Sequence, residues 1–225
     1  MVLAIVRVWV ALALMVSGGL MYAASWQRWV GACPWDGDQD TPACWTRMDH
    51  LYDFLAPSEP WTPAGDAAQL AGSSLLVLAL ALVPLPWALT GRRPGPGSAV
   101  GLLLTVLAVV AVGLATLRSG LAGEVVRPVA DDLVMWLWFL VPPVLFGRIA
   151  VLSPGWAARA AAVLLVLASP LVAGFTYAIG PFDAQPWWEA ISGVLTVLAS
   201  ACVLVEAVRR VVRTRDVVRE PAGVG

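Results

Sequence analysis

Six long apolar stretches without an Asp, Glu, Lys or Arg constrain this chain more than any other feature of its sequence. The stretches are residues 8–27, 67–91, 94–117, 133–147, 160–182 and 190–205. A helix needs about 20 apolar residues to cross the hydrocarbon core of a bilayer. With 60% hydrophobic residues, 13% charged residues and a mean hydropathy of +0.80, the composition is that of a membrane protein with several spans.

We therefore expect an all-α polytopic membrane protein with six transmembrane helices. The expected spans are residues 4–25, 68–90, 98–117, 131–152, 158–180 and 187–208, followed by a cytoplasmic tail over 209–225. The fourth span has the shortest uncharged stretch, residues 133–147, which rises only about 22 Å as a helix. The sixth is extended at each end on the expectation that Glu189 and Arg209 reach the membrane interface.

The arginines predict how these spans are oriented. With six crossings and a cytoplasmic N-terminus, ten arginines fall on the cytoplasmic side and four on the outer side, which agrees with the positive-inside rule. Both termini are then cytoplasmic. The alternative for the first span is a cleaved signal peptide, since small residues lie near its end, and the following loop stays outside in either case.

The basic residues are all Arg, with no Lys. Together with abundant Ala, Gly, Val and Pro, this usage is typical of a GC-rich bacterial genome, so we expect the cytoplasmic membrane of a bacterium. An outer aromatic belt agrees with the orientation. Its expected members are Trp26, Trp29, Trp187 and Trp188.

One sizeable hydrophilic segment, residues 26–66, separates the first two spans. Within it, Cys33 and Cys44 flank ten residues that include two prolines, a glycine and three alternating aspartates. This pattern predicts an extracytoplasmic loop closed by a disulfide, because a disulfide persists only in an oxidising compartment. The alternative is a catalytic thiol pair, which needs a stabilised thiolate, and the neighbouring aspartates disfavour one.

The same loop contains a short amphipathic pattern. Apolar residues recur at three- and four-residue spacing, which predicts a helix over 45–55 with one apolar face. The residues of that face are Trp45, Met48, Leu51, Tyr52 and Leu55. We expect this face to lie on the membrane surface or on the ends of the spans.

Metal binding by this loop is the less favoured interpretation of its polar residues. Asp36, Asp38 and Asp40 alternate like the first ligands of a calcium loop, but Thr41 and Arg47 stand where that motif needs Gly and Glu. A solvated acidic turn explains them better. His50, the single histidine, is more typical of a solvated or partner-contacting residue than of a zinc or copper ligand. No cofactor is therefore expected.

Polar residues and prolines within the spans are read as structural. Ser192, Thr196 and Ser200 fall four residues apart, a stripe that allows close helix packing. Kinks are expected at 142–143 and 169–170, because proline lacks the amide hydrogen of a helix. Glu206 is expected to pair along its own helix with Arg209 or Arg210.

No nucleotide-binding, hydrolase or metalloprotease motif is present. The favoured hypothesis is a non-catalytic accessory subunit whose Trp-rich outer loop binds a membrane-protein partner or a second copy; beyond the bilayer, no nucleic-acid partner is expected. Trp is favoured at binding anchors. The residues predicted to bind are Trp35, Trp45, His50, Tyr52 and Trp61. The alternatives are a small-solute transporter or channel, with a polar cavity between the kinked spans, and a membrane thiol-disulfide oxidoreductase.

Overall fold

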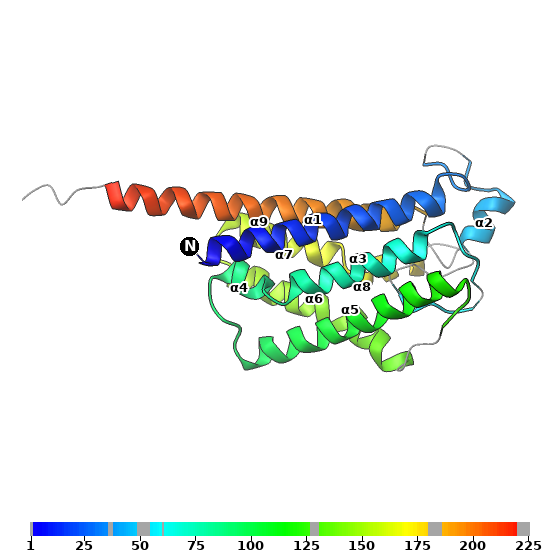
Figure 1. Ribbon diagram of the computed structural model, residues 1–225, viewed down its shortest axis with the longest axis horizontal. Coiled ribbons are helices and arrows are strands. Elements are labelled where there is room, and N and C mark those ends of the chain that lie inside the picture. The colour runs from blue at the N-terminus through cyan, green and yellow to red at the C-terminus, as the bar shows by residue number, and fades with distance from the viewer. Residues whose placement is uncertain are drawn as a thin grey trace, which may run out of the picture.

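The computed structural model describes residues 2–35, 38–48, 55–59, 61–126, 131–179 and 186–219, and these residues form helices and connections without a strand (Figure 1). The helices are α1 (Val2–Trp29), α2 (Pro42–Met48), α3 (Ala67–Leu82), α4 (Leu85–Thr90), α5 (Pro96–Ala122), α6 (Asp131–Leu152), α7 (Trp156–Leu167), α8 (Pro170–Ile179) and α9 (Trp188–Arg219). The predicted all-α class is confirmed.

Among the residues that the structure describes, four helices are long and apolar enough to cross a membrane. They are α1, α5, the segment Leu133–Leu152 of α6 and the segment Trp188–Val212 of α9. Two further apolar segments of similar total length are each divided into two helices, α3 with α4 and α7 with α8. The chain is thus a membrane-embedded protein by length and composition of its helices.

Proline explains both divisions. Pro84 and Pro86 cannot donate an amide hydrogen to the preceding turn, and regular bonding resumes where the Ala88 amide donates to the Pro84 carbonyl at 2.9 Å. Between α7 and α8, the Ser169 amide donates to the Val166 carbonyl at 3.1 Å and Pro170 opens the next helix. At the predicted kink 169–170 the segment is divided into two helices, whereas at the predicted kink 142–143 the helix α6 continues through both prolines.

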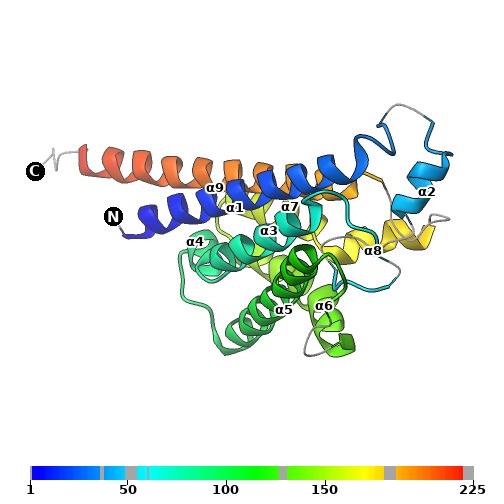
Figure 2. The ribbon, with the colours of Figure 1, turned by 45° about the vertical axis from the view of Figure 1, so that its right-hand side comes forward.

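The helix α1 lies against α9 on one side and α3 on the other (Figures 1 and 2). Glycines allow the backbones of α1 and α9 to approach closely, because a Cβ atom at Gly18 would lie only 2.6 Å from the carbonyl oxygen of Gly193. Buried hydroxyls cross the same interfaces: Ser17 donates to the Ser74 carbonyl at 3.0 Å. Small residues and interhelical hydrogen bonds are how helices associate in lipid.

The predicted polar stripe on α9 serves this packing. Ser192, Thr196 and Ser200 are all buried, and Ser200 donates a hydrogen bond to the Ala11 carbonyl of α1 at 2.7 Å. Thr196 donates to the Ser192 carbonyl of its own helix at 2.8 Å. The stripe lies in the interface between α9 and α1, so its interpretation as a packing surface is confirmed.

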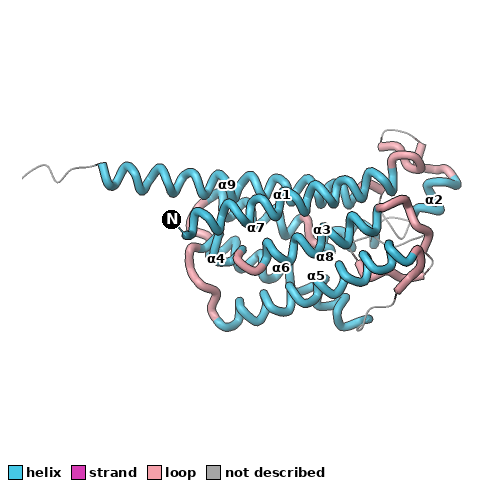
Figure 3. Tube along the Cα trace, viewed as in Figure 1, coloured by secondary structure: helices cyan, strands magenta, loops and turns pink. Residues whose placement is uncertain are grey.

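The two ends of the helical bundle differ in charge. One end, which we call the Arg-rich end, holds the start of α1, the connections from α4 to α5 and from α6 to α7, and the later turns of α9 (Figure 3). Its described arginines are Arg7, Arg92, Arg93, Arg148, Arg159, Arg209 and Arg210. Among the described side chains there, the carboxylate is that of Glu206, which accepts a hydrogen bond from Arg210 Nε at 2.6 Å. The predicted pairing of Glu206 along its own helix is confirmed.

A small cavity lies between α6, the α7–α8 break and α9. Its volume is about 20 Å³, and Pro142, Ser169, Pro170 and Thr196 are among its lining residues. A space of this size accommodates about one water molecule. This cavity lies between the spans where the transporter alternative expects a polar cavity.

Replacing Gly18 with Ala is expected to destabilise the protein by about 1–3 kcal/mol, the usual cost of overpacking. The added Cβ would meet backbone of α9, which cannot move aside without separating the two helices. Gly19→Ala is the matched control, because nothing lies within 4 Å of a Cβ at that position. Thermal unfolding in detergent should show a lower midpoint for Gly18→Ala alone. Equal midpoints for the two variants would contradict the close helix contact.

Candidate partner-binding site

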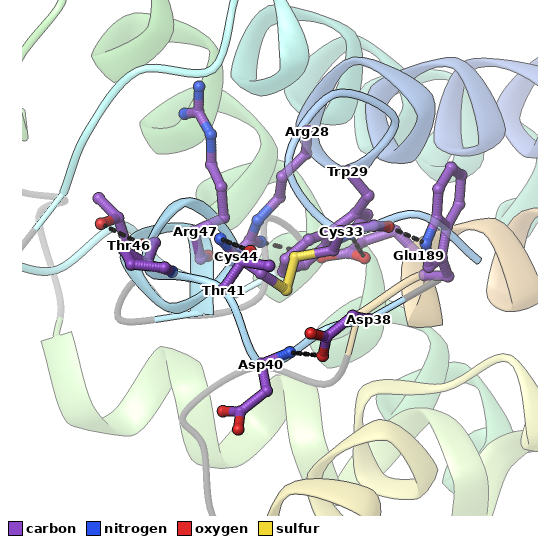
Figure 4. Close-up of a disulfide and its surroundings, with 12 residues drawn as sticks. Arg28, Trp29, Cys33, Asp38, Asp40, Thr41, Cys44, Thr46, Arg47 and Glu189 are labelled. Atoms are coloured by element: carbon purple, nitrogen blue, oxygen red, sulfur yellow. Dashed lines mark hydrogen bonds and ion pairs between the residues drawn. A yellow bond between two sulfur atoms is a disulfide. The ribbon is translucent and has the colours of Figure 1, made fainter. Parts of the chain in front are cut away.

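The predicted disulfide between Cys33 and Cys44 is present and joins the turn that follows α1 to the helix α2 (Figure 4). The chain turns sharply after α1, where the Cys33 amide donates to the Trp29 carbonyl at 2.8 Å. At the start of α2, the Cys44 amide donates to Thr41 Oγ1 at 3.2 Å, which is the usual capping role of a threonine. Both cysteines are fully buried. We call the end of the bundle that carries this bond the disulfide end.

The acidic part of the loop adopts a local turn. Asp38 accepts a hydrogen bond from the Asp40 amide at 2.8 Å (Figure 4), the pattern of an aspartate-stabilised turn. Asp36 lies outside the described residues. Within the ranges that the structure describes, no three His, Cys, Asp or Glu side chains are grouped to hold a metal ion.

A buried ion pair connects the disulfide end of α1 to the start of α9. Arg28 Nη1 lies 2.9 Å from Glu189 Oε1, with the two side chains 1% and 0% exposed. The second carboxylate oxygen accepts a hydrogen bond from Trp29 Nε1 at 2.7 Å. Figure 4 shows Arg28 and Trp29 both pointing at Glu189.

The same ion pair also fixes the disulfide loop. Arg28 Nη2 donates to the Arg47 carbonyl of α2 at 2.9 Å, and the guanidinium carbon lies 4.3 Å from the centre of the Trp29 ring. Arg28 stands in the last turn of α1 and Glu189 in the first turn of α9, so each charge also faces the helix end whose dipole stabilises it. One guanidinium thus holds three segments together.

The expectation that Glu189 reaches the membrane interface is wrong. Its carboxylate is turned inward and fully buried, because Arg28 and Trp29 supply both the opposite charge and the hydrogen-bond donors that water would otherwise provide. A buried charge is tolerated only with such compensation. Sequence reasoning missed this pair, although Arg28 and Glu189 are the charged residues nearest to the ends of their two spans.

Trp187 connects the disulfide to α9. Its Nε1 donates to the Cys33 carbonyl at 2.7 Å, and its backbone has a φ of 64°, a left-handed conformation that is rare for a bulky residue. Such conformations persist only where surrounding contacts fix them, and they concentrate at functional sites. The ring of Trp187 makes edge-to-face contacts with Trp26 and Trp35, each with a 5.9 Å centroid separation.

These rings form the wall of a groove of about 440 Å³, which we call the aromatic groove. It is lined by Tyr22, Trp26, Trp35, Trp187, Ala190, Ile191, Val194 and Leu195. The floor is formed by the first turns of α9, and the rings come from α1, the disulfide loop and the residue before α9. The volume of the aromatic groove lies within the range of small-molecule pockets, about 300–1,000 Å³.

The predicted binding residues are distributed unevenly around this groove. Trp35 lines it and is 63% exposed, Trp45 is 46% exposed elsewhere on α2, and Trp61 is half-buried. His50 and Tyr52 lie outside the described residues, as do most positions of the expected 45–55 helix. The described residues of its predicted apolar face differ in burial: Met48 and Leu55 are buried, whereas Trp45 is exposed.

Comparison with protein-family models, with curated proteins and with solved structures finds no match for this chain.

Replacing Glu189 with Gln is expected to cost about 3–5 kcal/mol of stability, because the Arg28 charge then stays buried without a counter-charge. The exposed Glu124 provides the control Glu124→Gln, which should be neutral. Unfolding by denaturant in detergent measures both. Replacing both members of the pair, as Arg28→Met with Glu189→Leu, should cost less than the sum of the single changes. Additive effects would contradict the pair.

Proposed function

We propose that this chain is a non-catalytic accessory subunit of the bacterial cytoplasmic membrane, and that its aromatic groove binds an apolar transmembrane segment of a partner membrane protein. The observation that carries this proposal is the groove itself, which is walled by four aromatic rings and floored by aliphatic side chains of α9. Aromatic residues in desolvated pockets dominate binding energy at interfaces.

The surroundings of the groove favour protein binding over incidental exposure. Three of its rings come from segments held by the disulfide, the Arg28–Glu189 pair and the hydrogen bond from Trp187 to Cys33. A surface that is already ordered loses little conformational entropy on binding. The side of the groove formed by α9 includes exposed residues such as Val194. A partner helix in the same bilayer could contact the groove there.

The proposal includes six crossings with both termini in the cytoplasm. In this arrangement α3 with α4 and α7 with α8 each complete one crossing, because each pair together has the length of a span. The segregation of arginine to the end that bears the start of α1 supports this orientation, as does the disulfide at the opposite end.

Two observations favour this role over the alternatives. The mid-bundle cavity of about 20 Å³ is too small for a solute path. Both cysteines are fully buried, whereas thiol exchange requires an attacking thiolate to reach a sulfur. A structural role for the disulfide is therefore the better interpretation.

The orientation can be tested with single cysteines in a Cys202→Ala background. Glu124→Cys stands between the third and fourth proposed crossings, and Gly97→Cys and Pro154→Cys stand at the opposite end, all at exposed positions. A membrane-impermeant maleimide added to intact cells should label Glu124→Cys, and the other two only after lysis. Labelling of Gly97→Cys or Pro154→Cys in intact cells would overturn the proposed orientation.

Partner binding can be tested by placing a photo-crosslinking amino acid at Trp26. We expect a product larger than the monomer that contains a second membrane protein. The matched control is Trp9 on the same helix, which is 52% exposed where Trp26 is 49% exposed but lies outside the groove. Equal crosslinking at both positions, or a product of two copies of this chain, would contradict the proposal.

A substitution gives the corresponding energetic test. Trp35→Ala should weaken co-purification with the crosslinked partner by about tenfold or more, as for a central anchor. Trp136→Ala is the control, because Trp136 is 64% exposed on α6 and does not line the groove. Equal losses for the two variants would indicate an effect of exposed tryptophan in general rather than of the groove.

A further inference from the structure

A second unusual site lies at the Arg-rich end, around the C-terminus of α4. Arg7, in the second turn of α1, is only 2% exposed, and its Nε donates to the Ala88 carbonyl of α4 at 2.8 Å. Its Nη2 is buried without a hydrogen-bond partner. A buried donor of a charged group that lacks an acceptor is costly, so this position calls for an anion or another acceptor.

A second guanidinium reaches the same helix end. Gly91 ends α4 in a left-handed conformation, with a φ of 74°, and Arg210 Nη1 lies 3.3 Å from the Cβ position of that glycine. Arg7 binds the Ala88 carbonyl of this same helix end. Arg7 and Arg210 therefore approach each other across the end of α4, with Glu206 bound to Arg210.

Among the side chains that the structure describes, arginines outnumber carboxylates around this site. Arg92 and Arg93 follow Gly91 directly in the chain and are exposed, so four arginines from three segments adjoin the end of α4. Against them stand Glu206 and the partial negative charge of the α4 C-terminus, about half an elementary charge. A further anion would offset the excess.

We propose that these four arginines, Arg7, Arg92, Arg93 and Arg210, bind the phosphate group of an anionic phospholipid. Arginine is suited to phosphate because its planar fork of donors matches the phosphate oxygens, and basic pockets beside membrane helices bind such headgroups. The acyl chains would lie along the apolar helices at this end. This site is independent of the aromatic groove, so either proposal can fail without the other.

The test compares the lipid-induced thermal stabilisation of the purified protein in detergent. Phosphatidylglycerol is added to one sample, zwitterionic phosphatidylcholine to a second, and phosphatidylcholine with inorganic phosphate to a third. We expect a rise in unfolding temperature with phosphatidylglycerol only. A rise with inorganic phosphate equal to that with phosphatidylglycerol would overturn the lipid as the source of the phosphate.

Two pairs of substitutions separate a site from general attraction. Arg92→Gln with Arg93→Gln should weaken phosphatidylglycerol binding by about tenfold or more, since each arginine near an anionic headgroup contributes substantially. Arg148→Gln with Arg159→Gln is the matched control, because it removes two exposed arginines of the same end that lie on α6 and α7 rather than in the connection that follows α4. Equal weakening by both pairs would overturn the proposal.

Arg7→Gln extends the test to the buried cation, and it should also abolish the selective stabilisation. Retention of the full phosphatidylglycerol effect in a folded Arg7→Gln protein would remove Arg7 from the site and overturn the four-arginine assignment. If this variant does not fold, the test uses the double variant Arg92→Gln with Arg93→Gln, because both residues are exposed. Native mass spectrometry then measures how much phosphatidylglycerol this variant binds.

Discussion

The close approach of α1 and α9 is the contact on which the rest of the structure depends. Lipid offers helices no hydrophobic reason to associate, so their contact requires dense packing and interhelical hydrogen bonds. Gly18 and Gly193 remove the side chains that would separate the two backbones, and Ser200 bonds to the Ala11 carbonyl further along the interface. This register brings Arg28 to Glu189 at one end and Arg7 near Arg210 at the other.

The disulfide loop is ordered by three restraints of different chemistry. The covalent bond closes the loop, the Arg28 guanidinium ties α2 to α9, and the indole of Trp187 bonds to the Cys33 carbonyl. Two of these restraints meet at Cys33 and two involve α2, so all three act on the same short part of the chain. The walls of the aromatic groove come from these same segments. The shape of the groove therefore depends on the order of the loop.

Hydropathy and local patterns were sufficient for part of this structure. They predicted the all-helical class, the disulfide, the interruption at Ser169 and the pairing of Glu206, because each depends on composition or on residues close in sequence. They did not predict the division at Pro84, whose effect depends on how two prolines in one turn combine.

The Arg28–Glu189 pair and the left-handed Trp187 could not be predicted in this way. The two charged residues are 161 positions apart, and a helix-by-helix analysis treats each as an exposed end residue. Only the packing of α1 on α9 decides that both turn inward. The conformation of Trp187 has the same origin, since it is fixed by the Cys33 carbonyl and by neighbouring rings rather than by any local turn signal.

The same pair of helices thus gives its two ends opposite electrostatic character. At the disulfide end, Arg28 and Glu189 neutralise each other inside the protein, beside the aromatic and aliphatic side chains that line the aromatic groove. At the Arg-rich end, Glu206 pairs with Arg210, whereas Arg7 Nη2 is buried without a hydrogen-bond partner among the described residues. Removing charge from solvent is costly unless it is compensated, and this cost is the physical basis of the proposed binding of an acidic lipid headgroup at this end.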